Sequence, residues 1–119
     1  MTKLGSIEYQ YKDYELALLH DKSALDMSFK FTKQKDPTIL INIAFCEWKL
    51  KRYQEALANC EEILHQYTDF ARAYSLRGLI NYDLGKKDKA CADFLIVSKI
   101  KGTEESGKEN LKTHGCSIN

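Results

Sequence analysis

The sequence has few of the features that mark membrane-spanning, secreted or nucleic-acid-binding proteins. It contains one proline and six glycines among 119 residues, few enough for a chain that is helical throughout. No apolar run approaches the roughly 20 residues that span a bilayer, and the first residues lack the apolar segment of a secretory signal. The 18 basic and 17 acidic residues leave a net charge of +1, without a basic surface. We therefore expect a cytoplasmic protein that binds neither nucleic acid nor membranes.

The four cysteines show no pattern of a metal site or a catalytic nucleophile. Cys46, Cys60, Cys91 and Cys116 are 14, 31 and 25 residues apart, with no CxxC pair and no histidine at ligand spacing. Without a secretory signal they are expected to be reduced thiols, Cys46 and Cys60 in the core and Cys116 exposed near the chain end. Glycine-rich phosphate loops are also lacking. We predict no metal, no cofactor, no catalytic residue and no enzymatic activity.

Residues 71–97 read as two helices joined by a tight turn. Apolar residues recur at helical spacing in both halves, and Gly85 stands where the first helix should end, since glycine readily adopts positive φ. Gly78 lies in mid-helix, where it costs roughly 1 kcal/mol relative to alanine. A glycine at such a position predicts that a neighbouring helix comes close to it.

The same pattern recurs along the chain. Shifted by 34 residues, Ala44, Leu50, Ala56 and Cys60 coincide with Gly78, Leu84, Ala90 and Phe94. A further copy near the N-terminus, five residues out of phase, matches Gly5, Tyr14, Ala17 and Ala24 to Ala44, Tyr53, Ala56 and Ile63. A period of 34 with small, aromatic and large residues in this order resembles the tetratricopeptide repeat. The resemblance implies an all-α solenoid of three helix-turn-helix hairpins plus a C-terminal capping helix.

Repeat boundaries follow from this register within a single domain, residues 1–119. Repeat one covers about 1–30 and is truncated at its N-terminus, repeat two about 37–68, repeat three about 69–101, and the capping helix about 103–114. In repeat one we expect a helix over 1–11, then a second helix capped by Asp13. Its apolar stripe would contain Leu16, Ala17, Leu19, Ala24, Leu25 and Met27. We then expect a polar connector over 28–36. Two helices would follow after Asp36-Pro37, over about 38–51 and 53–66.

The resemblance also implies a binding site, because the first helix of each hairpin lines a concave groove in this family. Mapped by register, the groove residues are Ser6, Tyr9, Thr38, Ile41, Asn42, Phe45, Trp48, Lys49, Arg72, Ser75, Leu79 and Tyr82. Tyr9, Trp48 and Tyr82 share one repeat position and are expected to form a row of anchors for a peptide. The alternative is that these aromatics pack between hairpins, because Glu47 and Asn81 occupy the usual packing position.

Repeat two is similar to that of immunophilin-type co-chaperones and their aryl-hydrocarbon-receptor-interacting relatives. The shared residues are Asn42, Ala44, Cys46, Lys49, Leu50, Tyr53, Ala56 and Cys60. Those proteins hold the C-terminal Glu-Glu-Val-Asp of heat-shock chaperones with a five-residue carboxylate clamp. Here Asn42 matches a clamp residue and Arg72 replaces a lysine, whereas Thr2, Ser6 and Leu76 replace the other three. Two lost cationic contacts, at roughly 1.5–3 kcal/mol each, should weaken binding about a hundredfold or more.

The sequence thus predicts a non-catalytic protein-protein interaction module that binds a partner peptide or protein in its groove, with a co-chaperone-like role as the more specific form. The alternative is a scaffold or dimerisation fragment of a larger protein, with the groove filled by its own segment or by a second copy. A homodimer therefore stays open as an alternative.

Overall fold

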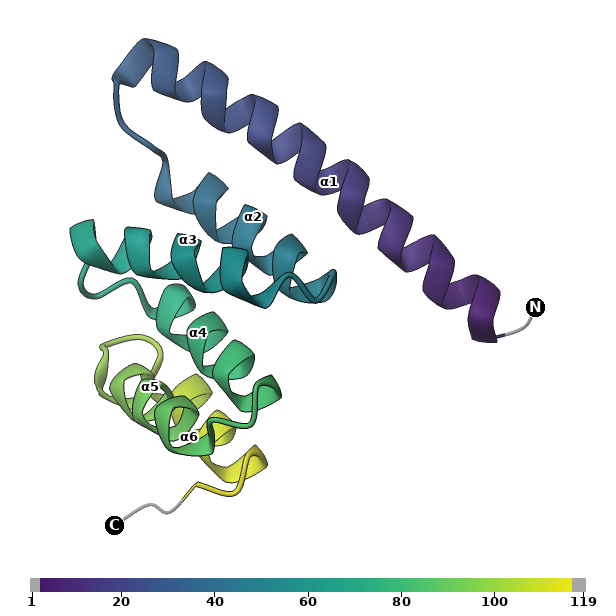
Figure 1. The fold of residues 1–119 in the computed structure, drawn as a ribbon. Helices are drawn as coiled ribbons and strands as arrows, with labels where there is room; N and C mark the ends of the chain where they lie inside the picture. Colours follow the sequence, from purple (N-terminus) through teal and green to yellow (C-terminus); the bar gives the residue numbers. More distant parts are fainter. Residues whose placement is uncertain (1–2, 117–119) are drawn as a thin grey trace. The chain divides into compact units, whose positions relative to one another are not determined.

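The computed structural model describes residues 3–116, with side chains from Lys12 onward, and this part of the chain is helical without a strand. Figure 1 shows the helices α1 (Lys3–Thr32), α2 (Pro37–Lys49), α3 (Tyr53–Gln66), α4 (Ala71–Asp83), α5 (Lys87–Lys99) and α6 (Glu104–Thr113). The all-α prediction is confirmed, and the arrangement is compatible with a helical repeat. None of these helices is long and apolar enough to cross a membrane.

The chain divides into two compact units, Met1–Asn59 and Cys60–Asn119. The first unit contains α1, α2 and the first half of α3. The second contains the end of α3 and the helices α4, α5 and α6, with α5 packed against both α4 and α6. Each unit has its own core cluster.

Repeat one differs from the prediction, because α1 is one continuous helix of 30 residues. The expected break before Asp13 is missing. The predictions of a first hairpin and of a helix cap at Asp13 were therefore wrong. The segment around Asp13 contains neither proline nor glycine, and an unbroken helix leaves fewer backbone groups without partners than two short ones. The predicted connector over 28–36 was also too long, since α1 continues to Thr32 and Lys33 ends it with a left-handed φ of 60°.

The face of α1 that packs against α2 agrees with the predicted stripe only at Ala17 and Leu25. Leu18 is buried together with Ile43 and Cys46 of α2, and Tyr14, Ala17, Leu25, Ile39 and Leu50 pack at the margin of this cluster. Of the predicted stripe, Leu16, Leu19 and Met27 are 55%, 63% and 63% exposed, and Ala24 is exposed as well. Apolar residues occur on both sides of this helix, and only one side faces α2. The amino-acid pattern did not show which.

Helix α2 begins as predicted. The Asp36 carboxylate accepts a hydrogen bond of 2.8 Å from the backbone N–H of Thr38, and Pro37 occupies the first helical turn, where a missing N–H does no harm. Cys46 and Cys60 are buried and outside the disulfide, which confirms their assignment to the core.

In the second unit, α4 and α5 approach closely at a glycine. A Cβ atom placed on Gly78 would lie 2.6 Å from Cε1 of Phe94, a fully buried ring. The close approach predicted for Gly78 is therefore confirmed, and so is the helix end at Gly85, whose φ is 79°. The surrounding core consists of Ala90, Phe94, Leu111 and Cys116, with Leu79 and Cys91 packed against it.

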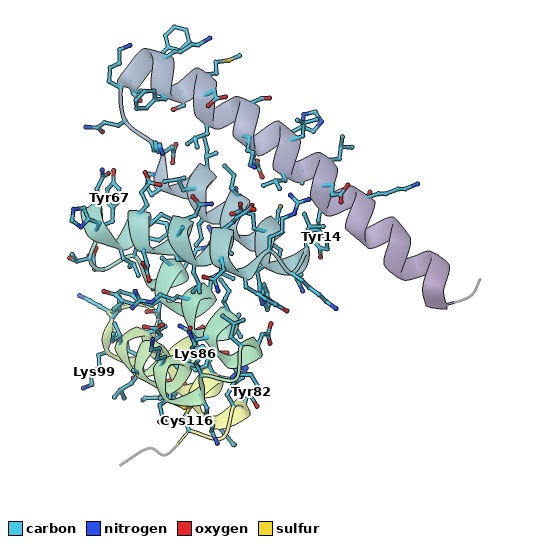
Figure 2. All side chains as sticks on the ribbon, viewed as in Figure 1. Tyr14, Tyr67, Tyr82, Lys86, Lys99 and Cys116 are labelled. Carbon is cyan, nitrogen blue, oxygen red and sulfur yellow. A yellow bond between two sulfur atoms is a disulfide. The ribbon has the colours of Figure 1, made fainter. Side chains whose placement is uncertain are left out.

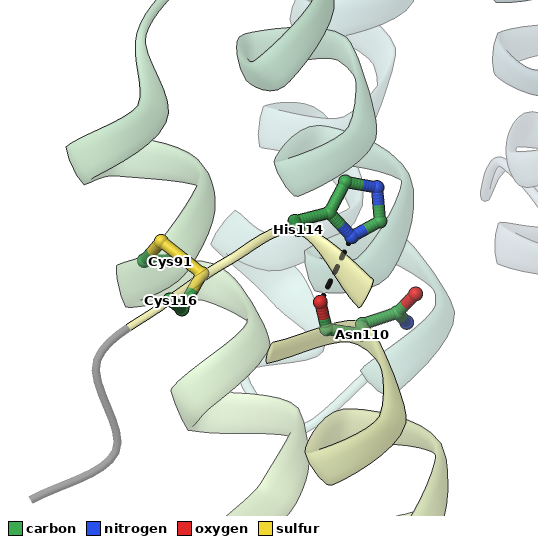
Figure 3. Close-up of a disulfide and its surroundings, with 4 residues drawn as sticks. All are labelled: Cys91, Asn110, His114 and Cys116. Atoms are coloured by element: carbon green, nitrogen blue, oxygen red, sulfur yellow. Dashed lines mark hydrogen bonds between the residues drawn. A yellow bond between two sulfur atoms is a disulfide. The ribbon is translucent and has the colours of Figure 1, made fainter. Parts of the chain in front are cut away.

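A disulfide joins Cys91 in α5 to Cys116 after α6 (Figure 3), with the two Cα atoms 5.6 Å apart. The prediction of four reduced cysteines and an exposed Cys116 was wrong, since Cys116 is only 9% exposed. Helix α6 runs back along α5, and this brings together two residues that are 25 positions apart. Reduced cysteines were one argument for a cytoplasmic location. That argument no longer holds, because structural disulfides are typical of oxidising compartments.

Candidate protein-binding surfaces

One surface of the first unit combines partly accessible aromatic rings with a cation. The Phe45 ring lies 6.3 Å from that of Tyr14 and 5.7 Å from that of Trp48, both edge-on, and Figure 2 labels Tyr14 on α1. The Nζ atom of Lys49 lies 4.8 Å from the Trp48 ring centroid and 5.6 Å from that of Phe45. Residues three and four positions apart share a face of a helix, which explains why α2 presents all three. We call Tyr14, Phe45, Trp48 and Lys49 the α2 cluster.

The α2 cluster keeps accessible surface for a ligand. Phe45 is 41% exposed, and Trp48 and Lys49 are half-buried. A cation over an aromatic face contributes about 0.5–1 kcal/mol at an exposed site, so Lys49 is held near the rings without being neutralised. The cluster can therefore offer an apolar anchor point and a positive charge side by side.

The other predicted groove residues of the first unit differ in accessibility. Thr38 is exposed and Asn42 is half-buried, whereas Ile41 is only 2% exposed and offers almost no surface to a ligand. Ser6 and Tyr9 lie outside the residues whose side chains the structure describes, and so does Thr2 of the clamp comparison.

In the second unit, Arg72 is exposed, Ser75 is half-buried, and Leu79 packs against the core cluster. Tyr82 is 41% exposed, but one side of its ring meets His114 edge-on at 4.6 Å, and His114 lies 4.8 Å from Phe94. The Nδ1 atom of His114 is hydrogen-bonded to the backbone carbonyl of Asn110 at 2.8 Å (Figure 3). Tyr82 thus has a packing role within its unit and also presents surface. The row of Tyr9, Trp48 and Tyr82 stays a prediction, since these residues belong to different units.

Glu47 is a buried carboxyl whose role the sequence pattern does not indicate. It is 2% exposed, and its Oε1 accepts a hydrogen bond of 2.6 Å from the Asn59 amide. Burial raises the pKa of Glu47 to about 7. The hydrogen bond from Asn59 opposes the increase, whereas a hydrogen bond with Glu55 and its charge add to it. Glu47 therefore titrates near neutral pH.

An open cleft of about 450 Å³ adjoins Glu47 in the first unit. It is lined by residues of α1, the connector, α2 and α3: Lys22, Leu25, Asp26, Lys35, Leu40, Ile43, Glu47, Glu55, Ala58 and Asn59. The lining is a mixture of charged and aliphatic side chains without serine, cysteine or histidine. Such a lining can hold a polar group.

A second buried polar pair, Arg77 and Asp93, connects α4 to α5. The Arg77 guanidinium donates to both carboxylate oxygens of Asp93, at 3.0 and 2.8 Å, and Asp93 is 4% exposed. The bond with Asp93 raises the pKa of Arg77 above its usual value, while desolvation opposes this. Arg77 also lies 5.5 Å over the Tyr74 ring. This pair was not predicted, because the two residues are 16 positions apart and have no distinctive motif.

Within residues 12–116, no group of three or more histidine, cysteine, aspartate and glutamate side chains could hold a metal ion. Over the described residues the protein is all-helical and built from packed helix pairs, with accessible aromatic and cationic side chains.

Among known proteins, the chain is similar to the peptidyl-prolyl cis-trans isomerase FKBP42 of Arabidopsis thaliana, with 28% identity over 119 residues. The match covers 94% of this chain but only 32% of FKBP42, so the chain spans about a third of the relative's length. No protein-family model matches the chain, and no solved structure matches it. A relative of this kind agrees with the resemblance to immunophilin-type proteins noted in repeat two.

Proposed function

We propose that this chain is a non-catalytic interaction module of a co-chaperone-like protein, which binds a partner protein or peptide through its tetratricopeptide-type groove. The observation that carries the proposal is the α2 cluster, where Phe45 and Trp48 keep accessible surface beside Lys49. Aromatic anchors such as tryptophan often contribute most of the binding energy at protein interfaces.

The arrangement favours a peptide that has an apolar side chain next to an acidic group. Phe45 and Trp48 would receive the apolar side chain, and Lys49 would pair with the carboxylate. Asn42 lies one turn before Phe45 on α2 and would donate a hydrogen bond to the peptide backbone. The second unit by itself also offers an exposed cation, Arg72, and an exposed ring, Tyr82.

The isomerase activity in the relative's name is not part of this proposal. The aligned region is only about a third of that protein. Binding alone needs only the accessible side chains of α2 and α4.

The test is a pull-down from a cell lysate with tagged wild-type chain and the double variant Trp48→Ala plus Tyr82→Ala. Partners held in the groove should be lost by the double variant. The matched control is Tyr67→Ala, since Tyr67 is 37% exposed, close to the 41% of Tyr82, and lies outside the predicted groove. If the folded double variant keeps every partner, these aromatics serve packing alone and the proposal fails.

A further inference from the structure

The C-terminal end of α6 is attached to α5 by the disulfide, and a helix-capping motif presents Cys116 for that bond. The N–H of Cys116 donates to the carbonyl of Leu111 at 2.8 Å, and the N–H of Gly115 donates to that of Lys112 at 3.2 Å. With the positive φ of Gly115, 68°, these two bonds form a Schellman motif. The motif turns the chain at the end of α6, so that Cys116 joins Leu111 in the core cluster beside α5.

Few apolar side chains hold this end of α6 in place. In α6 itself only Gly107 and Leu111 are buried, and Leu111 is its one large apolar residue. Just after the helix, the His114 ring packs against Tyr82 at 4.6 Å and against Phe94 at 4.8 Å. A helix of ten residues is not stable by itself in water, so α6 depends on its attachment to the rest of the unit. The disulfide is therefore a large part of what fixes its C-terminal end.

The N-terminal end of α6 is attached to α5 without the disulfide. The Thr103 hydroxyl donates to the backbone carbonyl of Val97 at 3.0 Å. Gly107 lies so close to the backbone of Ser98 that a Cβ atom at this position would overlap with it. Loss of the disulfide should therefore free the C-terminal end of α6, while the turn between α5 and α6 stays in place.

We propose that the disulfide is a redox-sensitive latch on the second unit. In the oxidised form the latch holds Leu111 and His114 over the Phe94 ring, which is fully buried. In the reduced form the end of α6 moves away and uncovers Phe94, together with the side of Tyr82 that His114 covers. The latch does not depend on the proposed function. Its consequence for a partner does, because Tyr82 belongs to the predicted groove.

The reductant is a dithiol, and its point of attack is Cys91, which is half-buried and more accessible than Cys116. A thiolate of the dithiol bonds to Sγ of Cys91, the S–S bond breaks, and Cys116 leaves as a thiolate that takes up a proton. The second thiolate of the dithiol then attacks the sulfur already bonded to Cys91, which is released and protonated. The protein disulfide gains two electrons and two protons, and the dithiol becomes a disulfide.

Hydrogen exchange of the full chain, read by mass spectrometry with and without dithiothreitol, tests the latch. In the reduced protein the amides of residues 108–116 should exchange at least about tenfold faster than in the oxidised protein. The amides of residues 71–83, in α4, should keep their rates. Equal rates for 108–116 in both forms overturn the proposal. So does an equal acceleration of 71–83, because the whole unit would then unfold and not the end of α6 alone.

The matched control is the double variant Cys91→Ser plus Cys116→Ser. It should show the fast exchange of 108–116 without any reductant and should not respond to dithiothreitol. Slow exchange in this variant overturns the proposal, since the disulfide would then not be what fixes α6. A thiol count after acid quenching and unfolding checks that dithiothreitol reduces the native protein. A disulfide that resists reduction until the protein is unfolded also overturns the proposal, because it would be a permanent cross-link.

Discussion

The Asn59 amide donates a hydrogen bond of 2.6 Å to the buried carboxyl of Glu47, and this contact joins α2 to α3 in the first unit. Desolvation raises the pKa of Glu47 from 4.5 to about 7. A carboxyl with a raised pKa stabilises the folded state in its protonated form. That stabilisation is complete below about pH 4.5 and is lost as the pH rises to about 7.

We therefore expect Glu47→Gln to be more stable than the wild type at pH 8, by on the order of 3 kcal/mol if the full shift is expressed. The two proteins should be about equally stable at pH 4, because glutamine then replaces a neutral carboxyl. Urea unfolding at several pH values measures the difference. The exposed Glu109→Gln serves as control, and a difference independent of pH would show that Glu47 is not the titrating group.

Gly78→Ala should destabilise the second unit. The added methyl group would meet the Phe94 ring, which is fully buried and has no free space to move into. Overpacking of this kind costs about 1–3 kcal/mol, measured by chemical denaturation. In a Phe94→Leu background the smaller side chain leaves room, so the cost of Gly78→Ala should shrink. An unchanged cost in that background would rule out the ring as its cause.

Arg77→Met should destabilise the same unit because it leaves the Asp93 carboxylate buried without its bidentate partner. Arg77 keeps 26% of its side chain exposed, so water can partly replace it. We expect the free energy of unfolding to fall by about 2–3 kcal/mol, which is less than the usual cost of breaking a fully buried pair. The double variant Arg77→Met plus Asp93→Leu should recover much of this loss. Equal stability of Arg77→Met and the wild type would mean that the pair contributes nothing.

The disulfide predicts a specific thiol count. Protein unfolded without reductant should show two reactive thiols, those of Cys46 and Cys60, and four after reduction. Replacing Cys91 and Cys116 together by serine should lower stability by about 2–4 kcal/mol, since the unfolded chain loses a covalent loop. Four reactive thiols in the unreduced protein would show that Cys91 and Cys116 are not paired.

A peptide ending in Glu-Glu-Val-Asp should bind weakly or not at all. Leu76, which occupies the position of a clamp arginine, is apolar and 5% exposed, so it cannot contact a carboxylate. Isothermal titration calorimetry is the measurement, with the same peptide amidated at its C-terminus as the control. Low-micromolar affinity that depends on the free carboxylate would contradict this prediction.

The sequence was informative where local chemistry decides the outcome. Pro37 with the Asp36 cap marked the start of α2, and Gly85 marked the end of α4, because caps and positive φ depend on a few neighbouring residues. It was misleading at α1, where Asp13 looked like a cap and yet lies inside a continuous helix. The choice between a cap and an interior position depends on what the flanking segments pack against.

What the amino-acid sequence determined by itself is the helical class, the limits of most helices and the need for a close contact at Gly78. These follow from periodicity, capping and the size of single residues. Only the tertiary structure decided that Cys91 pairs with Cys116, that Asn59 bonds to Glu47, and that α1 turns Leu18 inward and Leu19 outward. Each of these depends on which distant residues are brought together when helices pack, and no local pattern specifies that.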